Sequence, residues 1–316
     1  MPQDEPLFHT PQELVHAYQA GGFKGYVPSE RDKEEFLASN PVRFFSSPGG
    51  GKGQRALLWD YVLRLDATAF SEKQTVGDCV SHGSRNARDC TRAVSILLHG
   101  KPQDWLIRTA TEPTYGARGH GGEGMSPARA SQFERDVGFC PRLDFPGVVN
   151  LATYDGSLGA RWGRQGGTPE NVKELCRRNK VGTIALVKSL DDAMDALFNG
   201  YGIHSGQMAA WSNTPNRKNI HGRVSPGWAH DMATIGFDDT RTHWPFRVWF
   251  LANSWGRWNS PVPEWPGDYP LQVPGMIVTD DEGYAVCVEA DDMWAYSDVQ
   301  GFPPRTLPDL GTIGRI

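Results

Sequence analysis

The longest periodic stretch of apolar and small residues runs over positions 79–98. Its members recur at alternating spacings of three and four residues, and they are Val80, Gly83, Ala87, Cys90, Val94 and Leu97. This period places them on one face of an α-helix, so the stretch predicts a helix with one buried side. Asp78 stands where an N-cap is expected, and Gly100 followed by Pro102 marks the end.

Weaker signals predict several shorter helices in the first two thirds of the chain. The expected ranges are 11–19 with Thr10 as N-cap, 30–38 with Ser29, 127–137 after Ser126, 169–179, and 190–199 with Ser189. Glycine-rich or irregular residues between them predict loops at 47–53, 116–127 and 150–168. The loop at 47–53 lacks the spacing of a phosphate-binding loop, because Gln54 follows Gly53.

The pattern changes after residue 200. Residues 228–237, 246–252 and 284–290 are aromatic and β-branched, which predicts strands, and residues 300–316 look irregular. Helices that come first and strands that come later indicate an α+β fold rather than alternating βα units.

Length and charge narrow the class of protein. The chain has 316 residues, which favours two domains or one bilobal unit, and its formal net charge of −5 gives no basic footprint for nucleic acid. No apolar run reaches the length of a membrane-spanning helix, and the first residues do not resemble a secretory signal. We therefore expect no nucleic-acid partner, no membrane association, and a location in the cytoplasm or in a virus particle.

Cysteine and histidine usage bears on the chemistry. The five cysteines are odd in number and form no C-x-x-C pair, which argues against a disulfide framework or a zinc ribbon and favours a reducing compartment. The histidines show no ligand spacing, so we expect no metal and no cofactor. One of the cysteines is then a candidate for a chemical role.

Cys79 is that candidate, because it stands at the start of the predicted helix. Free backbone N–H groups and the helix dipole favour a thiolate there. The alternative is a small buried apolar residue. His230 lies in a predicted strand and Asn253 follows another; taken singly, they are as well explained by a core histidine and a turn residue.

Together the three residues follow the chain order Cys, His, Asn, and their contexts agree with one family. Gln74 precedes Cys79 at a helix start, His230 is followed by Gly236-Phe237, and Asn253 opens Asn-Ser-Trp-Gly. The sequence resembles the papain-like cysteine peptidases in these three places. The resemblance extends over about residues 70–295.

The resemblance implies a fold and a division of the chain. The fold is papain-like α+β with two lobes, a helical left lobe at 70–180 and an antiparallel β-barrel-like right lobe at 181–295. Residues 1–69 would be an N-terminal extension and residues 296–316 a C-terminal tail.

The resemblance also implies roles. Cys79 would be the nucleophile, His230 its proton-transfer partner and Asn253 the residue that orients His230. Trp255 would shield this pair from water, and Gln74 would line the oxyanion hole. Gly121 or Gly122 would pair its backbone with an extended peptide or protein substrate.

Two departures from the family pattern keep other functions open. Gln74 stands five residues before the cysteine rather than six, and Asp78 would place a negative charge beside the thiolate and oppose its formation. The first hypothesis is a cysteine peptidase or related thiol amidase. The alternatives are a weak or inactive structural component of a larger assembly, including a viral one, and an acyl transferase or transglutaminase. Other protein subunits would then hold the N- and C-terminal extensions.

Overall fold

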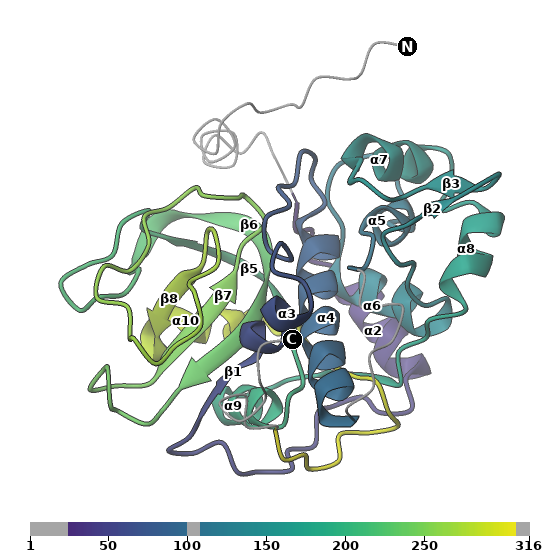
Figure 1. The fold of residues 1–316 in the computed structure, drawn as a ribbon. Coiled ribbons are helices and arrows are strands. Elements are labelled where there is room, and N and C mark those ends of the chain that lie inside the picture. The colour runs from purple at the N-terminus through teal and green to yellow at the C-terminus, as the bar shows by residue number, and fades with distance from the viewer. Residues whose placement is uncertain (1–24, 100–107, 308–316) are drawn as a thin grey trace.

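The computed structural model describes residues 25–99 and 108–307. A long helix, α4 (Cys79–His99), runs down the middle of the molecule (Figure 1). The strands of the large sheet and α10 gather on one side of α4, and helices α5 to α8 gather on the other with the short strands β2 and β3. The other helices are α2 (Glu30–Ser39), α3 (Leu58–Leu65), α5 (Glu112–Gly116), α6 (Pro127–Asp136), α7 (Gly156–Arg164), α8 (Glu170–Cys176), α9 (Leu190–Phe198) and α10 (Asp281–Glu289).

The β-rich side is built on one antiparallel sheet. Its strands follow the order β4-β9-β5-β6-β7-β8, and β1 pairs with β6. Their bounds are β1 (Arg55–Leu57), β4 (Thr183–Leu186), β5 (Ile203–Trp211), β6 (Arg223–Asp238), β7 (Val248–Ala252), β8 (Ile277–Asp280) and β9 (Met293–Ser297). A separate hairpin joins β2 (Asp144–Phe145) to β3 (Val149–Asn150). The α+β class with two lobes is confirmed, and within the described residues the sheet is open rather than a closed barrel.

Serine caps begin three of the predicted helices. The side chains of Ser29, Ser126 and Ser189 each accept a hydrogen bond from a backbone N–H in the first turn, at α2, α6 and α9. These caps satisfy donors that have no partner within the helix. The expected helices at 30–38, 127–137 and 190–199 are therefore confirmed, whereas the one at 11–19 lies outside the described residues.

Three local predictions were wrong. Residues 156–164, expected to be a loop, form α7, in which the Asp155 side chain caps the first turn and glycines fill the buried face. The range 284–290, expected to be a strand, forms most of α10 and its C-cap instead, and Asp280 accepts a hydrogen bond from the Gly283 N–H at the start of this helix. The Asp78 side chain does not cap α4; it accepts a hydrogen bond from the Tyr154 hydroxyl at 2.9 Å instead.

The core lies where α4 meets the sheet. Gly83 and Gly202 allow this close approach: a methyl group on Gly83 would collide with the Asp231 carboxylate on β6, and one on Gly202 would collide with the Ala87 backbone of α4. β1 pairs with β6, and α3 packs against α4. Part of the segment assigned from sequence to the N-terminal extension therefore contributes to this core.

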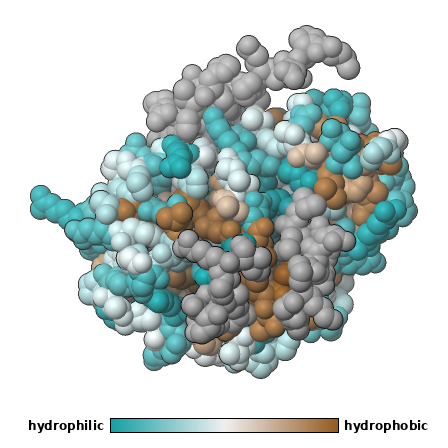
Figure 2. Space-filling view, in the orientation of Figure 1, coloured by the Kyte–Doolittle hydropathy of each residue, from teal (hydrophilic) through white to brown (hydrophobic). Residues whose placement is uncertain are grey.

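The surface is hydrophilic over most of the face in Figure 2, with patches of apolar residues between. Across residues 25–99 and 108–307, no helix has both the length and the apolar character needed to cross a membrane. The same ranges hold no group of three or more His, Cys, Asp or Glu side chains that could bind a metal ion. All five cysteines are free and buried.

Candidate active site

Cys79 is the first residue of α4, and it is fully buried. The first N–H groups of a helix have no acceptor within it, so they stabilise negative charge at this position. Cys79 belongs to a small apolar cluster with Tyr26, Val80, Met125 and Ala130, and Ala229 of β6 packs against this cluster. The cysteine therefore faces the junction between the two lobes.

His230 and Asn253 meet on neighbouring strands. His230 lies on β6, and Asn253 follows the last residue of β7. The His230 Nε2 and the Asn253 Oδ1 are 2.9 Å apart. An amide oxygen can only accept, so Nε2 carries the proton and donates it to this hydrogen bond. Nδ1 is then the nitrogen that can take up a proton.

Tryptophan rings enclose the histidine. The Trp255 ring lies over the His230 ring, with centroids 4.4 Å apart and planes tilted by 34°. Trp228 and Trp258 pack on Trp255 at centroid distances of 4.9 Å and 5.4 Å. All three indoles are buried, so they keep water away from the hydrogen bond between His230 and Asn253.

The start of α4 packs against the part of β6 that carries His230. Gly83, one turn after Cys79, lies against Asp231, the residue after His230. Ala229, the residue before His230, packs against the cluster that contains Cys79. The residues next to His230 on β6 therefore contact the first turn of α4 and its surroundings.

Gln74 ties the loop before α4 to the segment after β7. Its backbone N–H donates to the Ser254 carbonyl at 2.8 Å, and its side-chain oxygen accepts from the Ser254 hydroxyl. Its Nε2 donates to the Val76 carbonyl at 2.9 Å, which uses one of the two N–H groups. These bonds fix the loop that precedes Cys79 to the segment after Asn253.

Burial controls the charge of His230. Burial lowers the pKa of His230 to about 3, and the hydrogen bond to Asn253 offsets only part of this effect. The imidazole is therefore neutral at pH 7 in this arrangement. A thiolate–imidazolium pair needs the site to open to water or needs the thiolate itself to stabilise the cation.

Asp78 does not carry the charge expected from the sequence. Burial raises the pKa of Asp78 to about 8, although the Tyr154 hydroxyl donates to its carboxylate. The carboxyl is mostly protonated at pH 7. The expectation that Asp78 opposes thiolate formation through its negative charge was therefore wrong, because it overlooked the burial of this side chain.

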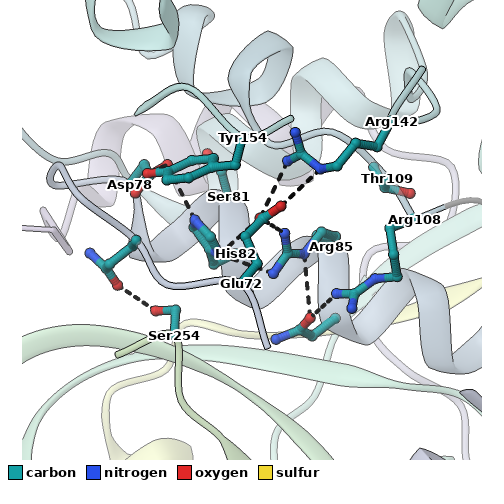
Figure 3. A network of polar contacts seen from close by, with 12 residues as sticks. Glu72, Asp78, Ser81, His82, Arg85, Arg108, Thr109, Arg142, Tyr154 and Ser254 are labelled. Atoms are coloured by element: carbon teal, nitrogen blue, oxygen red, sulfur yellow. Dashed lines mark hydrogen bonds and ion pairs between the residues drawn. The ribbon is translucent and has the colours of Figure 1, made fainter. Parts of the chain in front are cut away.

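Figure 3 shows a buried polar network that includes Asp78, the residue before Cys79 in the sequence. His82, one turn into α4, accepts from the Arg85 Nη2 at 3.0 Å, and its Nε2 lies 3.4 Å from the Asp78 carboxylate. Burial lowers the pKa of His82 well below its ordinary value, so this imidazole is neutral. Burial opposes charge on Glu72, but Arg85 and Arg142 outweigh it and lower the pKa of Glu72 to about 2. The sequence pattern gave no signal for this network, because Arg142 and Tyr154 join residues 72–85 from more than fifty positions further along the chain.

Residues 25–27, here called the covering segment, lie across the site. The Tyr26 N–H donates to the Ala229 carbonyl at 3.2 Å. The Val27 N–H donates to the Met125 carbonyl at 2.9 Å, and the Met125 N–H donates to the Gly25 carbonyl at 3.1 Å. An extended chain is thus hydrogen-bonded to both lobes next to His230.

The backbone pairing falls on Met125 in this structure. Gly121 and Gly122, which the resemblance suggested for substrate binding, lie in an exposed bend, four and three residues before Met125 respectively. Met125 follows Gly124, which adopts a left-handed φ of 83°, and it precedes the Ser126 cap of α6. The sequence signal that could have located it is this junction of a glycine-rich loop with a helix cap.

Comparison with known proteins supports the fold. Xylellain, a cysteine protease from Xylella fastidiosa, matches over 88% of this chain and 92% of its own, with 14% identity and a TM-score of 0.50. The cysteine protease and lectin-like domains of Cwp84, a surface layer associated protein of Clostridium difficile, match over 87% of this chain and 61% of theirs, with 15% identity and a TM-score of 0.54. No protein-family model and no curated protein matches the sequence.

The chain has the fold of the papain-like cysteine proteases, as the sequence resemblance predicted. The comparisons give no support to a role in a virus particle or another assembly.

Proposed function

We propose that this protein is a cysteine peptidase that cleaves peptide bonds through Cys79, His230 and Asn253. The hydrogen bond of 2.9 Å between His230 and Asn253, buried under Trp255 at the start of α4, carries the proposal. It fixes the tautomer in which Nδ1 can accept a proton, which is the state that a nucleophilic thiol requires of its base.

The reaction would run in two halves. The Cys79 thiol passes its proton to His230 Nδ1, and the sulfur attacks the substrate carbonyl carbon to give a tetrahedral oxyanion. His230 then returns the proton to the departing amine, and a thioester remains on Cys79. Water attacks the thioester with His230 as base and releases the carboxylic acid and the free thiol.

The oxyanion would be held at the start of α4. The Cys79 backbone N–H is one donor, because it has no acceptor within the helix. The Gln74 side chain would be the second donor, as the family resemblance implies, and its bonds to Val76 and Ser254 fix it in the loop before α4. Such donors are worth about 3 kcal/mol each in transition-state stabilisation.

The test is the rate at which iodoacetamide alkylates Cys79 between pH 5 and pH 9, read by peptide mass spectrometry. We expect Cys79 to react well below the pKa of a free thiol, about 8.5, and to lose this reactivity in His230→Ala. Cys90 is the internal control, because burial raises its pKa. The proposal is wrong if Cys79 reacts no faster than Cys90 both in the wild type and in Tyr26→Ala, the variant in which the site is opened.

A further inference from the structure

We propose that the pocket holding Tyr26 selects a tyrosine side chain of the substrate, with Asp292 as its specificity-determining residue. This inference rests on the proposed function, because it treats the covering segment as occupying the place of a substrate. It concerns which side chain binds beside the reacting residues.

The covering segment is bound as a peptide ligand would be. Its three hydrogen bonds are all between backbone groups, to Met125 on one lobe and Ala229 on the other. Backbone pairing gives affinity without sequence preference, whereas side-chain pockets give preference. Tyr26 supplies the side chain here, and it is only 4% exposed.

The walls of the pocket fit a flat ring. A methyl group on Gly206 of β5 would occupy the same space as the Tyr26 ring and would come within 2.9 Å of the Pro127 Cγ. Tyr26 also packs in the cluster of Cys79, Val80 and Met125. The absence of a side chain at residue 206 therefore makes room for the ring.

The end of the pocket is acidic. Gly206, which packs against the Tyr26 ring, donates its backbone N–H to the Asp292 carbonyl at 3.2 Å, so Asp292 lies beside the ring. Burial and the nearby carboxyls of Asp292 and Asp231 all raise the pKa of the Tyr26 hydroxyl. Asp231 is already paired with the His204 Nδ1 at 3.0 Å, while one oxygen of Asp292 accepts from the Trp294 Nε1 at 2.8 Å. Asp292 is thus the acceptor that remains for a hydroxyl at the tip of the ring.

An acceptor at this depth separates tyrosine from its closest analogues. A site built to hydrogen-bond a hydroxyl disfavours the analogue that lacks it, because the buried acceptor is then left without a donor. Burial raises the pKa of Asp292 to about 7, which suits a neutral donor such as a phenol better than a guanidinium. Phenylalanine, leucine and arginine should all bind more weakly.

A binding experiment tests the pocket without relying on turnover. The protein is the full chain with Tyr26→Ala and Cys79→Ala, and the probes are fluorescein-labelled peptides of residues 21–30 of this chain. One peptide carries the natural tyrosine, and three carry phenylalanine, leucine or arginine in its place. We expect the tyrosine peptide to bind at least fivefold more tightly than each of the others, measured by fluorescence anisotropy.

Two further variants locate the selectivity. Asp292→Ala should make the tyrosine and phenylalanine peptides bind equally, and Gly206→Ala should weaken both without weakening the leucine peptide. Thermal melting of each variant checks that it is folded. Equal binding of all four peptides before these changes, tighter binding of the arginine peptide, or no binding at 1 mM would overturn the inference.

Cleavage assays separate this inference from the proposed function. The Tyr26→Ala chain with Cys79 intact is given fluorogenic peptides in which each of the four residues before the cleaved bond is varied in turn. Cleavage that depends on Cys79 but shows no preference for tyrosine would overturn the inference about the pocket and support the proposed peptidase function. Selective binding of the tyrosine peptide without any cleavage would support the inference about the pocket and overturn the proposed peptidase function.

Discussion

The backbone N–H of Tyr26 donates to the carbonyl oxygen of Ala229, the residue that immediately precedes His230, at 3.2 Å. This bond couples the covering segment to the strand that carries the candidate base. His230 is fully buried, and burial is the main cause of its low pKa. Because Tyr26 packs in the cluster that contains Cys79, a substrate of the proposed peptidase would have to displace the covering segment.

Replacing Tyr26 should open the site. In Tyr26→Ala the covering segment loses its buried side chain, which costs about 3–5 kcal/mol of local packing. The segment should therefore bind less tightly to Met125 and Ala229. We expect Cys79 to be alkylated at least tenfold faster at pH 7 than in the wild type, measured by mass spectrometry.

The control for this change is Phe44→Ala. Phe44 is also an aromatic residue of the N-terminal region, but its side chain is half exposed. It should leave the alkylation rate of Cys79 unchanged. Equal rates for Tyr26→Ala and the wild type would show that the covering segment does not limit access.

Asn253 should matter for activity more than for the fold. Asn253→Ala leaves the buried His230 Nε2 without its acceptor, so the ring can rotate and the required tautomer is no longer fixed. We expect kcat/KM for a fluorogenic peptide to fall about 10- to 100-fold. The hydrogen bond to Asn253 raises the pKa of His230, so its loss should lower that pKa further.

The control is a second asparagine, Asn259, which lies outside the candidate site. Its Nδ2 donates to the Met276 carbonyl at 2.8 Å. Asn259→Ala should lower the free energy of unfolding by a similar amount and leave kcat/KM within twofold. A similar loss of activity in both variants would assign Asn253 a structural role only.

The sequence predicted the places of the candidate residues in the fold better than their surroundings. The structure confirms that Cys79 begins a helix and that Asn253 follows an apolar strand, because local patterns mark both positions. The protonation of Asp78 could not be found, because it depends on burial by Tyr154, a residue 76 positions away. The same holds for the covering segment, whose role depends on Met125 and Ala229 meeting across the two lobes.

The misassigned elements show the same limit at the level of secondary structure. Residues 284–290 have the composition of a strand, but Asp280 caps a helix over Asp281–Glu289, and three apolar side chains of that helix are buried. Residues 156–164 contain three glycines, which weaken an isolated helix, yet Gly159 packs directly on the Glu112 backbone of α5. In both segments the helical conformation depends on packing against other parts of the fold, which the local sequence does not reveal.

Gly83 should be required for the junction of α4 and β6. Alanine is the better helix former by about 1 kcal/mol, so an isolated helix would gain from Gly83→Ala. Here the added methyl group would collide with the Asp231 carboxylate. We expect a net loss of about 1–3 kcal/mol in the free energy of unfolding, measured by urea denaturation.

Gly121→Ala is the control, because it adds the same methyl group at a site with more room. The nearest neighbour of the added methyl group would be the Arg164 side chain at 3.9 Å, which is an ordinary contact distance. It should change the free energy of unfolding by less than about 0.5 kcal/mol. A neutral or stabilising Gly83→Ala would mean that α4 and β6 do not approach as closely as the structure has them.

The buried carboxyl of Asp78 should make stability depend on pH. Its pKa is about 8 in the folded chain and near 3.8 in the unfolded chain. Between these values the folded state holds a proton that the unfolded state has released, so the free energy of unfolding falls as pH rises. The slope from one such group is at most about 1.4 kcal/mol per pH unit.

Asp78→Asn removes this contribution while keeping an oxygen that can accept from Tyr154. The stability of the variant relative to the wild type should therefore increase steadily from pH 5 to pH 8, measured by urea denaturation at each pH. Tyr154→Phe is the complementary variant, because it removes the donor that lowers the pKa of Asp78. In this variant the pH range over which the free energy of unfolding falls should extend to higher pH. A constant difference between Asp78→Asn and the wild type over this range would show that Asp78 is ionised in the folded chain, and its charge would then oppose the Cys79 thiolate after all.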